Sequence, residues 1–298
     1  MLATSVPTRI QVKNVLFATD FSPAADAAIP YVREIVARYG AKLVTLHVRP
    51  PLVNPMTPPA SWTSTLEHAQ LEEQKQRAGL RLAFGDLRPV VLFEEGDILS
   101  SLAAAVEKYQ VDLVVVGTRG RSGAGKFFLG STAEEIFRNA SCPVLTVGPN
   151  SRVAPAKDKP LREIIYATDF SGEPSKAAAY AVSLAQEFQA NLTLLHVIPE
   201  PRAGELVNAV QLEDATRQLL HKLVPPDAES WCEPEYRIEL GDVAEKILST
   251  ANAKHADLIV LGVRPEKGFP GAATHLPIAT AHKVVSHAVC PVITVRNE

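Results

Sequence analysis

The stretch LVVVGTRGRSGAGKFFLGST, residues 113–132, decides the fold because it passes from a buried strand through a glycine-rich loop into a helix. It opens on four apolar residues, three of them valine, a run typical of a strand buried on both faces. Gly117 and Gly120 are separated by two residues, and Gly130 and Ser131 follow after nine more. Glycines let a backbone approach phosphate oxygens, and the first N–H groups of a helix attract anions. The stretch indicates an anion-binding loop, although glycines that only make turns remain an alternative.

The flanking sequence alternates between strand-like and helix-like segments. We predict strands at 12–18, 42–48, 90–93, 113–116 and 144–147, and helices at 23–39, 64–83, 98–109 and 132–139. Asp97 is placed to cap the third helix, and Gly40 to end the first. Helices that alternate with strands imply a parallel sheet with right-handed crossovers, hence an α/β fold.

The chain then repeats itself. IIYATDFS at 164–171 matches VLFATDFS at 15–22, and LTLLHVIP at 192–199 matches LVTLHVRP at 43–50, both offset by 149 residues. The Cys-Pro-Val at 290–292 repeats the one at 142–144, offset by 148. Such spacing indicates a tandem duplication. We therefore expect a first domain at 1–149, a proline-bearing linker at 150–160 and a second domain at 161–298.

Composition limits the classes of function. The chain has 298 residues, 21% of them charged, with a net charge of −3, which argues against a nucleic acid or membrane partner. It lacks both a signal pattern and an apolar run long enough to span a bilayer, so we expect a cytoplasmic protein. Its three cysteines make neither a disulfide framework nor a zinc site.

The glycine spacing after a buried strand, together with Thr19-Asp20 and the second-strand Val48, resembles the universal stress protein family. The resemblance covers nearly the whole chain. It implies two tandem doubly wound domains, each with a five-stranded parallel sheet, Rossmann-like and similar to the adenine nucleotide α-hydrolases. It also implies binding of ATP, alone or as its Mg2+ complex. By this resemblance, the adenosine would be held by Ala18, Thr19, Asp20 and Val48. The triphosphate would be held by Gly117, Arg119, Gly120, Gly130, Ser131 and Thr132.

The second half departs from this pattern. Pro265 stands in place of the second loop glycine, and Ile278 and Ala279 stand in place of Gly130 and Ser131. Proline lacks an N–H group and isoleucine blocks close backbone approach, so this loop is a poor phosphate cradle. Asp169 and Val197 keep the adenosine side open for a smaller nucleotide. We expect one ATP per chain, bound in the first half.

Part of the glycine-rich loop also resembles a P-loop. Residues 120–126, GRSGAGK, fit part of a P-loop, but Phe127 replaces the Ser or Thr that binds magnesium. No Ser-His-Asp, Cys-His or metal-ligand pattern is readable, so we expect no dedicated enzyme and at most slow ATP hydrolysis. The alternative function is a nucleotide-independent module that binds a protein partner, not identified by the sequence.

We also expect the last strands, 144–147 and 292–295, to pair within the chain, and a homodimer is open to the full chain through another surface.

Overall fold

The computed structural model describes residues 10–51, 62–118, 130–148, 151, 161–170, 174–200, 209–226, 228, 232–263 and 278–296. The first half contains β1 (Asn14–Ala18), α1 (Pro23–Asp26), α2 (Ile29–Tyr39), β2 (Lys42–Arg49), α3 (Trp62–Phe84), the 3-10 turn η2 (Gly85–Leu87), β3 (Val90–Glu95), α4 (Ile98–Tyr109), β4 (Leu113–Gly117), α5 (Ser131–Asn139) and β5 (Val144–Val147). The second half contains β6 (Glu163–Ala167), α6 (Pro174–Phe188), β7 (Asn191–Ile198), α7 (Ala209–Lys222), β8 (Glu235–Leu240), α8 (Val243–Ala253), β9 (Leu258–Val263), α9 (Ile278–His287) and β10 (Val292–Arg296).

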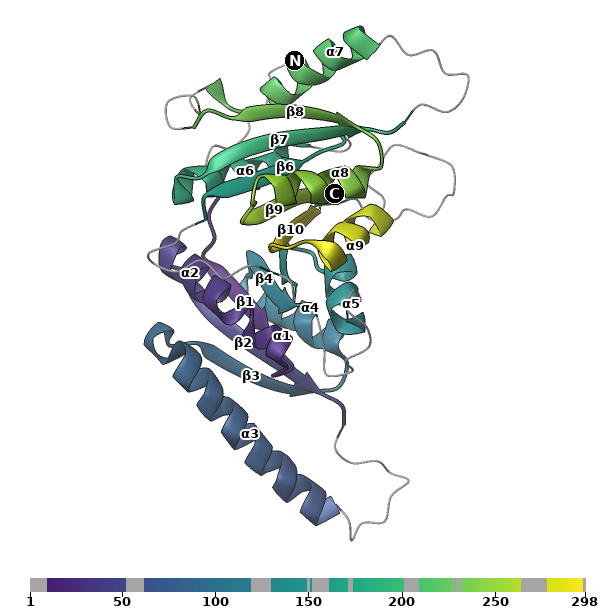
Figure 1. Cartoon of the computed structure of the whole chain (residues 1–298). Helices are drawn as coiled ribbons and strands as arrows, with labels where there is room; N and C mark the ends of the chain where they lie inside the picture. Colours follow the sequence, from purple (N-terminus) through teal and green to yellow (C-terminus); the bar gives the residue numbers. More distant parts are fainter. Residues whose placement is uncertain are drawn as a thin grey trace.

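The ten strands form one continuous sheet in the order β3-β2-β1-β4-β5-β10-β9-β6-β7-β8. Within each half the neighbouring strands are parallel, and only the central pair β5–β10 is antiparallel. The sheet therefore runs the length of the molecule, with α3 beyond β3 at one end and α7 beyond β8 at the other (Figure 1). The expected α/β class and the expected pairing of the last strands are confirmed, but the two five-stranded sheets are fused into one.

The fusion obeys a pseudo-twofold symmetry. Leu145 lies directly opposite Ile293, its own equivalent at the 148-residue offset. The hydroxyl of Thr146 donates to the carbonyl of Val292 over 3.0 Å, and that of Thr294 donates to the carbonyl of Val144 over 3.3 Å. Each half thus presents the same edge to the other, as two copies of one subunit would.

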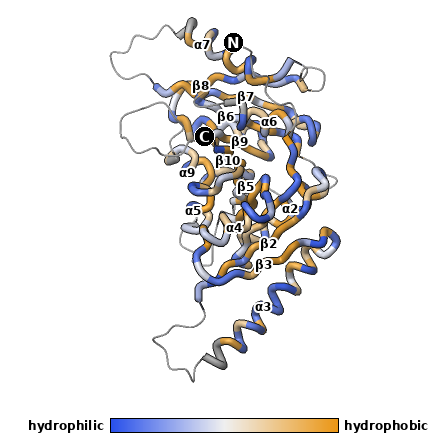
Figure 2. Tube along the Cα trace, turned by 180° about the vertical axis from the view of Figure 1, so that it is seen from behind, coloured by the Kyte–Doolittle hydropathy of each residue, from blue (hydrophilic) through white to orange (hydrophobic). Residues whose placement is uncertain are grey.

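Each face of the sheet carries a hydrophobic core that crosses from one half to the other. Helices α2, α3, α6 and α7 contribute to the core on one face, and α4, α5, α8 and α9 to the core on the other. The central strands are the most hydrophobic part of the trace, whereas α3 alternates between hydrophobic and hydrophilic turns (Figure 2). Because both cores span β5 and β10, the halves fold against each other as one body.

The predicted first helix is interrupted, which corrects the sequence-based expectation of one helix to residue 39. It ends as α1 at Asp26 and resumes as α2 at Ile29. Pro30, in the first turn of α2, has no N–H to donate to a carbonyl one turn earlier, so a continuous helix cannot form there. The predicted caps are confirmed. The Asp97 carboxylate accepts the Ser100 N–H at 2.8 Å, and Gly40 ends α2 with a φ of 62°.

Candidate functional site

A cavity of about 350 Å3 opens at the carboxyl ends of β1, β2 and β4, and it is lined on one side by α5. The size falls within the roughly 300–1,000 Å3 that is usual for small-molecule sites. Strand order reverses between β1 and β4, which is where doubly wound sheets bind ligands. Eight of the ten predicted site residues line it, namely Ala18, Thr19, Asp20, Val48, Gly117, Gly130, Ser131 and Thr132. Arg119 and Gly120 lie outside the described residues.

The turn after β1 presents Asp20 to the cavity. The Thr19 N–H donates to the Leu46 carbonyl at 2.9 Å, and the Thr19 carbonyl accepts a hydrogen bond from Nδ1 of His47 at 2.8 Å. The Asp20 Oδ1 atom accepts the Ser22 N–H at 3.0 Å, which leaves its second oxygen available to a ligand. The hydroxyl of Ser22 in turn caps α1. Asp20 is therefore fixed by the backbone of its own turn.

An apolar wall faces this turn. Leu46 and Val48 project from β2, Val116 projects from β4, and Ile98 lies in the first turn of α4. A flat base of a nucleotide packs well on such a surface. The apolar lining residues Ala25, Leu46, Ile98, Val116, Ala133 and Ile136 were not predicted from the sequence. Strand alternation could have indicated Leu46 and Val116, since residues two apart share a face with Val48 and lie beside Ala18.

The N-terminus of α5 supplies the polar side of the cavity. Gly130 is the N-cap residue, no side chain caps the helix, and Ser131 and Thr132 form its first turn. The Gly130 N–H donates to the Thr118 carbonyl at 2.7 Å, so the N-terminus of α5 lies beside the end of β4. Backbone N–H groups at such an uncapped end are available to an anion.

The two glycines that line the cavity, Gly117 and Gly130, differ in their structural surroundings. A Cβ atom on Gly117 would lie 2.4 Å from the carbonyl oxygen of Ala24, so packing against α1 requires glycine there. Gly130 has φ −61° and ψ 142°, an extended conformation that any residue adopts. The backbone therefore does not require glycine at position 130, and open space for a ligand is a physical reason for it.

The second half keeps the turn but changes the helix end. Thr168 and His196 repeat the 2.8 Å hydrogen bond of Thr19 and His47, and burial lowers the pKa of His196. Helix α9 begins at Ile278, which stands at the position of the α5 N-cap Gly130, and Ala279 stands at the position of Ser131. The Lys283 Nζ atom lies 3.2 Å from both Asp242 Oδ1 and Glu245 Oε1, and so connects α9 to the N-terminus of α8.

The equivalent residues of the first half are Glu135, Asp97 and Ser100, at offsets of 148 and 145. Two carboxylates cannot form an ion pair, so the connection made by Lys283 has no counterpart between α4 and α5 at these positions. The N-terminus of α8 is thus tied to the middle of α9 in the second half, and this contact is missing between Asp97 and Glu135 in the first.

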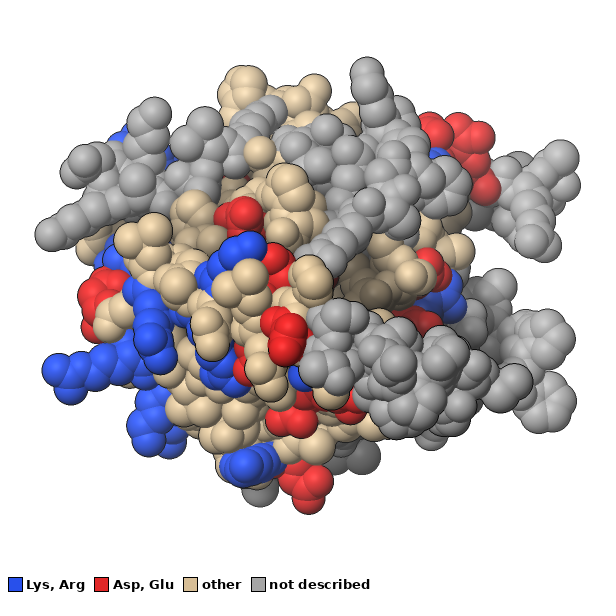
Figure 3. All heavy atoms as spheres, turned by 90° about the horizontal axis from the view of Figure 1, so that it is seen from below, with Lys and Arg blue, Asp and Glu red and all other residues tan. Residues whose placement is uncertain are grey.

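The described residues offer little for covalent or metal chemistry. Among them, no group of three His, Cys, Asp or Glu side chains is placed to hold a metal ion. Burial raises the pKa of the Cys142 thiol to about 11 and also raises that of Cys232, so neither is primed as a nucleophile. Within the described part of the chain, no helix is both long and apolar enough to cross a bilayer. Seen from below, acidic and basic residues are interspersed, with Lys and Arg gathered toward one side (Figure 3).

Comparisons with known proteins agree with this architecture. The model of the universal stress protein family matches residues 11–148 and again 160–296. A universal stress protein of Mycolicibacterium smegmatis is 26% identical over 95% of this chain and 97% of its own length, and one of Thermus aquaticus is 30% identical over 45% of this chain and 98% of its own. The crystal structure of a universal stress protein from Archaeoglobus fulgidus has the same fold, with a TM-score of 0.70, 19% identity, and coverage of 97% of this chain and 100% of that one. The chain belongs to the universal stress protein family.

Proposed function

We propose that the first half binds an adenine nucleotide, ATP alone or as its Mg2+ complex, and that the protein acts as a nucleotide-dependent regulatory protein of the stress response. The observation that carries the proposal is the convergence of three separate segments on one cavity: the Asp20 turn, the β2 end at Val48 and the α5 N-terminus at Gly130–Thr132. The acid and the apolar wall at one side suit a nucleoside, and the open helix N–H groups at the other side suit its phosphates.

Each part of the ligand has a partner in this arrangement. The free oxygen of Asp20 can accept a hydrogen bond from a ribose hydroxyl, whereas it would repel a phosphate. The base lies against Val48 and Ile98, and the phosphates lie at Ser131 and Thr132. ATP hydrolysis, at most slow, would be a side reaction, because the one carboxylate among the described cavity residues, Asp20, is proposed to lie at the nucleoside end and not beside the phosphates.

Occupancy should be restricted to the first half. The second half has Ile278 and Ala279 at the helix end, and Lys283 ties α9 to α8. Isoleucine is bulkier than the glycine that it replaces, which disfavours close approach of a phosphate, and alanine supplies no hydroxyl donor.

The direct test is mass spectrometry of the freshly purified, gently denatured protein, which identifies any nucleotide that co-purifies. We expect an adenine nucleotide. Titration of the full chain with Asp20→Ala adds the chemical detail: affinity for ATP should fall about tenfold, the value of one hydrogen bond to a charged group, while affinity for pyrophosphate stays unchanged. An equal loss for both ligands would place Asp20 away from the nucleoside. Absence of ATP binding by the folded wild-type chain would refute the proposal itself.

A further inference from the structure

A cluster of aromatic and charged side chains lies behind the cavity, on the opposite face of the sheet. Val48 faces the cavity, and because strand residues alternate, its neighbours His47 and Arg49 face the other side. There His47 meets Phe21, which follows Asp20 directly in the chain. Three residues adjacent to predicted ligand contacts, His47, Arg49 and Phe21, therefore lie on the back of the sheet.

Four of these side chains form what we call the back-face stack: His47, Phe21, Phe93 and Arg77. The ring centroids of Phe21 and His47 are 4.8 Å apart, and those of His47 and Phe93 are 5.4 Å apart. Phe21 and Phe93 lie 6.0 Å apart with nearly parallel rings. The Arg77 guanidinium, from α3, sits 4.4 Å from the Phe93 centroid. These separations are those of favourable aromatic and cation–π contacts.

The stack holds a strained turn. Phe21 has a φ of 57°, in the left-handed region that residues with a side chain seldom adopt. Its N–H donates to the Thr19 hydroxyl at 3.0 Å, and its ring is fixed by His47 and Phe93. A conformation of this kind persists only where its surroundings enforce it. Because Asp20 precedes Phe21, the contacts that hold Phe21 also fix where the Asp20 carboxylate points.

Helix α3 anchors the stack through a second set of contacts. Glu73 Oε1 lies 2.8 Å from Arg77 Nη2, and its Oε2 lies 3.4 Å from Arg49 Nη1. Arg49 Nε also lies 3.6 Å from Glu95 Oε2 at the end of β3. The Glu73 and Arg49 side chains are only about a quarter exposed, so water screens their interaction less than that of a surface pair. Arg49 follows Val48 in β2. Helix α3 therefore makes two contacts behind the cavity, through Glu73 with Arg49 and through Arg77 with Phe93.

The second half provides an internal comparison. Phe170 has the same φ of 57° and lies 4.7 Å from His196, so the strained turn is repeated. Ile238, Ile198 and Leu240 stand at the positions of Phe93, Arg49 and Glu95. Glu213 and Arg217 on α7 form an i,i+4 ion pair like that of Glu73 and Arg77 on α3. This second pair lies at the surface, with side chains 55% and 46% exposed.

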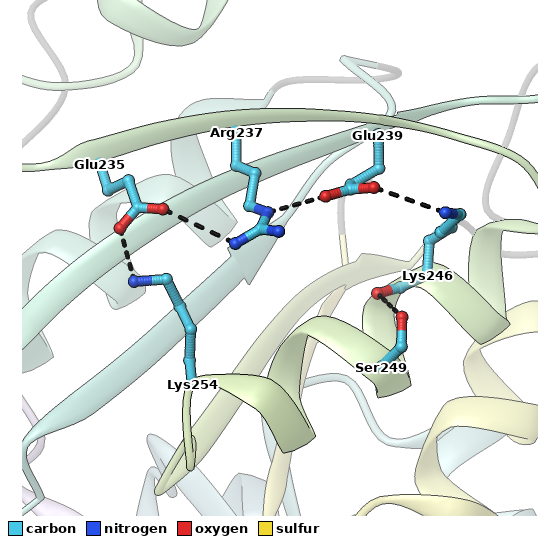
Figure 4. A network of polar contacts seen from close by, with 6 residues as sticks. All are labelled: Glu235, Arg237, Glu239, Lys246, Ser249 and Lys254. Atoms are coloured by element: carbon cyan, nitrogen blue, oxygen red, sulfur yellow. Dashed lines mark hydrogen bonds and ion pairs between the residues drawn. The ribbon is translucent and has the colours of Figure 1, made fainter.

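The charges of β8 are directed to the other face of the sheet. Arg237 bonds Glu239 over 2.8 Å, Lys246 of α8 lies 3.5 Å from Glu239, and Lys254 pairs with Glu235 (Figure 4). The alternate residues Tyr236 and Ile238 face α7. Among the described residues of the second half, α7 contacts β8 through the rings of His221 and Tyr236, 3.8 Å apart, and Ile238 beside His196 gives no counterpart of the Phe93–Arg77 contact.

We infer that the back-face stack positions Asp20 for the nucleoside and that α3, through Arg77, sets the affinity of the cavity. This inference rests on the proposed nucleotide function. Arg77 and Phe93 are positioning residues, since neither lines the cavity. Displacement of α3 would release Phe21 and loosen the Asp20 turn, so that affinity for the nucleotide falls.

The test compares four variants of the full chain. Phe93→Ile gives β3 the residue of the second half, Arg77→Ala removes the cation, and Arg77→Lys keeps a cation above the ring. Arg217→Ala is the matched control, because it removes the same type of helical ion pair in the second half. Two quantities are measured: hydrogen exchange of the Phe21 and Ser22 amides without ligand, by NMR, and the Kd for ATP by titration. Thermal unfolding verifies that each variant is folded.

We expect Phe93→Ile to speed exchange of these two amides about fivefold and to weaken ATP about five- to tenfold, the size of an aromatic pair contribution. Arg77→Ala should weaken ATP about threefold, Arg77→Lys should recover most of this loss, and Arg217→Ala should change neither quantity. Unchanged exchange in Phe93→Ile and Arg77→Ala would overturn the inference, and so would faster exchange with unchanged affinity. Faster exchange in a protein whose wild type does not bind ATP would refute the nucleotide function and confirm only the hold on the turn.

Discussion

The two halves of the molecule share the turn after their first strand and differ at the helix that follows their fourth. Thr19 and Thr168 are held by equivalent histidines at the same 2.8 Å, and Phe21 and Phe170 have the same φ. At the helix end, Gly130 and Ser131 of the first half are matched by Ile278 and Ala279 of the second. The shared turn is thus compatible with both an open and an altered helix end. In the proposed function, this difference at the helix end decides which half holds the phosphates.

The comparison can be broken by giving the first half the helix end of the second. In Gly130→Ile/Ser131→Ala, a side chain fills the N-cap space and a hydroxyl donor is lost, while the extended backbone at position 130 accepts isoleucine. If two charge-assisted hydrogen bonds are lost and each contributes about 1.5–3 kcal/mol, ATP affinity should fall by about two to four orders of magnitude. Isothermal titration measures the loss, and thermal unfolding should be nearly unchanged. Ala279→Ser in the second half is the control, expected to leave ATP binding as it was.

The equivalence of the two edges at the centre of the sheet can be tested by separating them. Residues 1–150 alone would expose the β5 edge, whose apolar strand opposes β10 in the full chain. Because Leu145 lies opposite its own equivalent Ile293, a second copy of the first half can take the place of β10 in the same register. We expect a homodimer by light scattering. A monodisperse monomer would show that the pairing depends on residues particular to the second half.

The contrast between the two cavity glycines predicts a smaller effect, on folding. Gly117→Ala places a Cβ atom 2.4 Å from the Ala24 carbonyl oxygen, so α1 must shift and the free energy of unfolding should fall by about 1–3 kcal/mol. Gly148→Ala is the matched control, since its nearest neighbours would be 3.7 Å away. Urea unfolding of both variants compares them. Equal free energies of unfolding for the two variants would mean that α1 shifts without loss of stability. Gly117 would then be required only by a ligand.

Much of this architecture was predictable because local patterns carry it. The apolar runs located the five strands of the first half, the caps Asp97 and Gly40 marked helix ends, and the expected pairing of the last strands is seen in β5–β10. The break before Pro30 was missed because the amphipathic pattern continues across it. The fusion into one sheet follows from that pair, whereas the two cores shared by the halves depend on packing between them, which no local pattern encodes.

The site was only partly predictable for a related reason. Polar residues and glycines such as Asp20 and Gly130 stand out in the sequence, whereas apolar wall residues such as Ile98 and Val116 resemble any core residue. The back-face stack was invisible, since Arg77 and Phe93 become neighbours only when α3 packs across the sheet. His47 lies in the predicted strand 42–48. The structure adds its hydrogen bond to the Thr19 carbonyl, through which it fixes the turn.

The stoichiometry of ATP binding to the intact chain tests the central claim most directly. The full chain, stripped of any nucleotide and titrated calorimetrically with ATP, should bind one equivalent, and Gly130→Ile/Ser131→Ala should abolish that single site at the same protein concentration. Two equivalent ATP sites per chain, or one site that survives this substitution, would contradict the account.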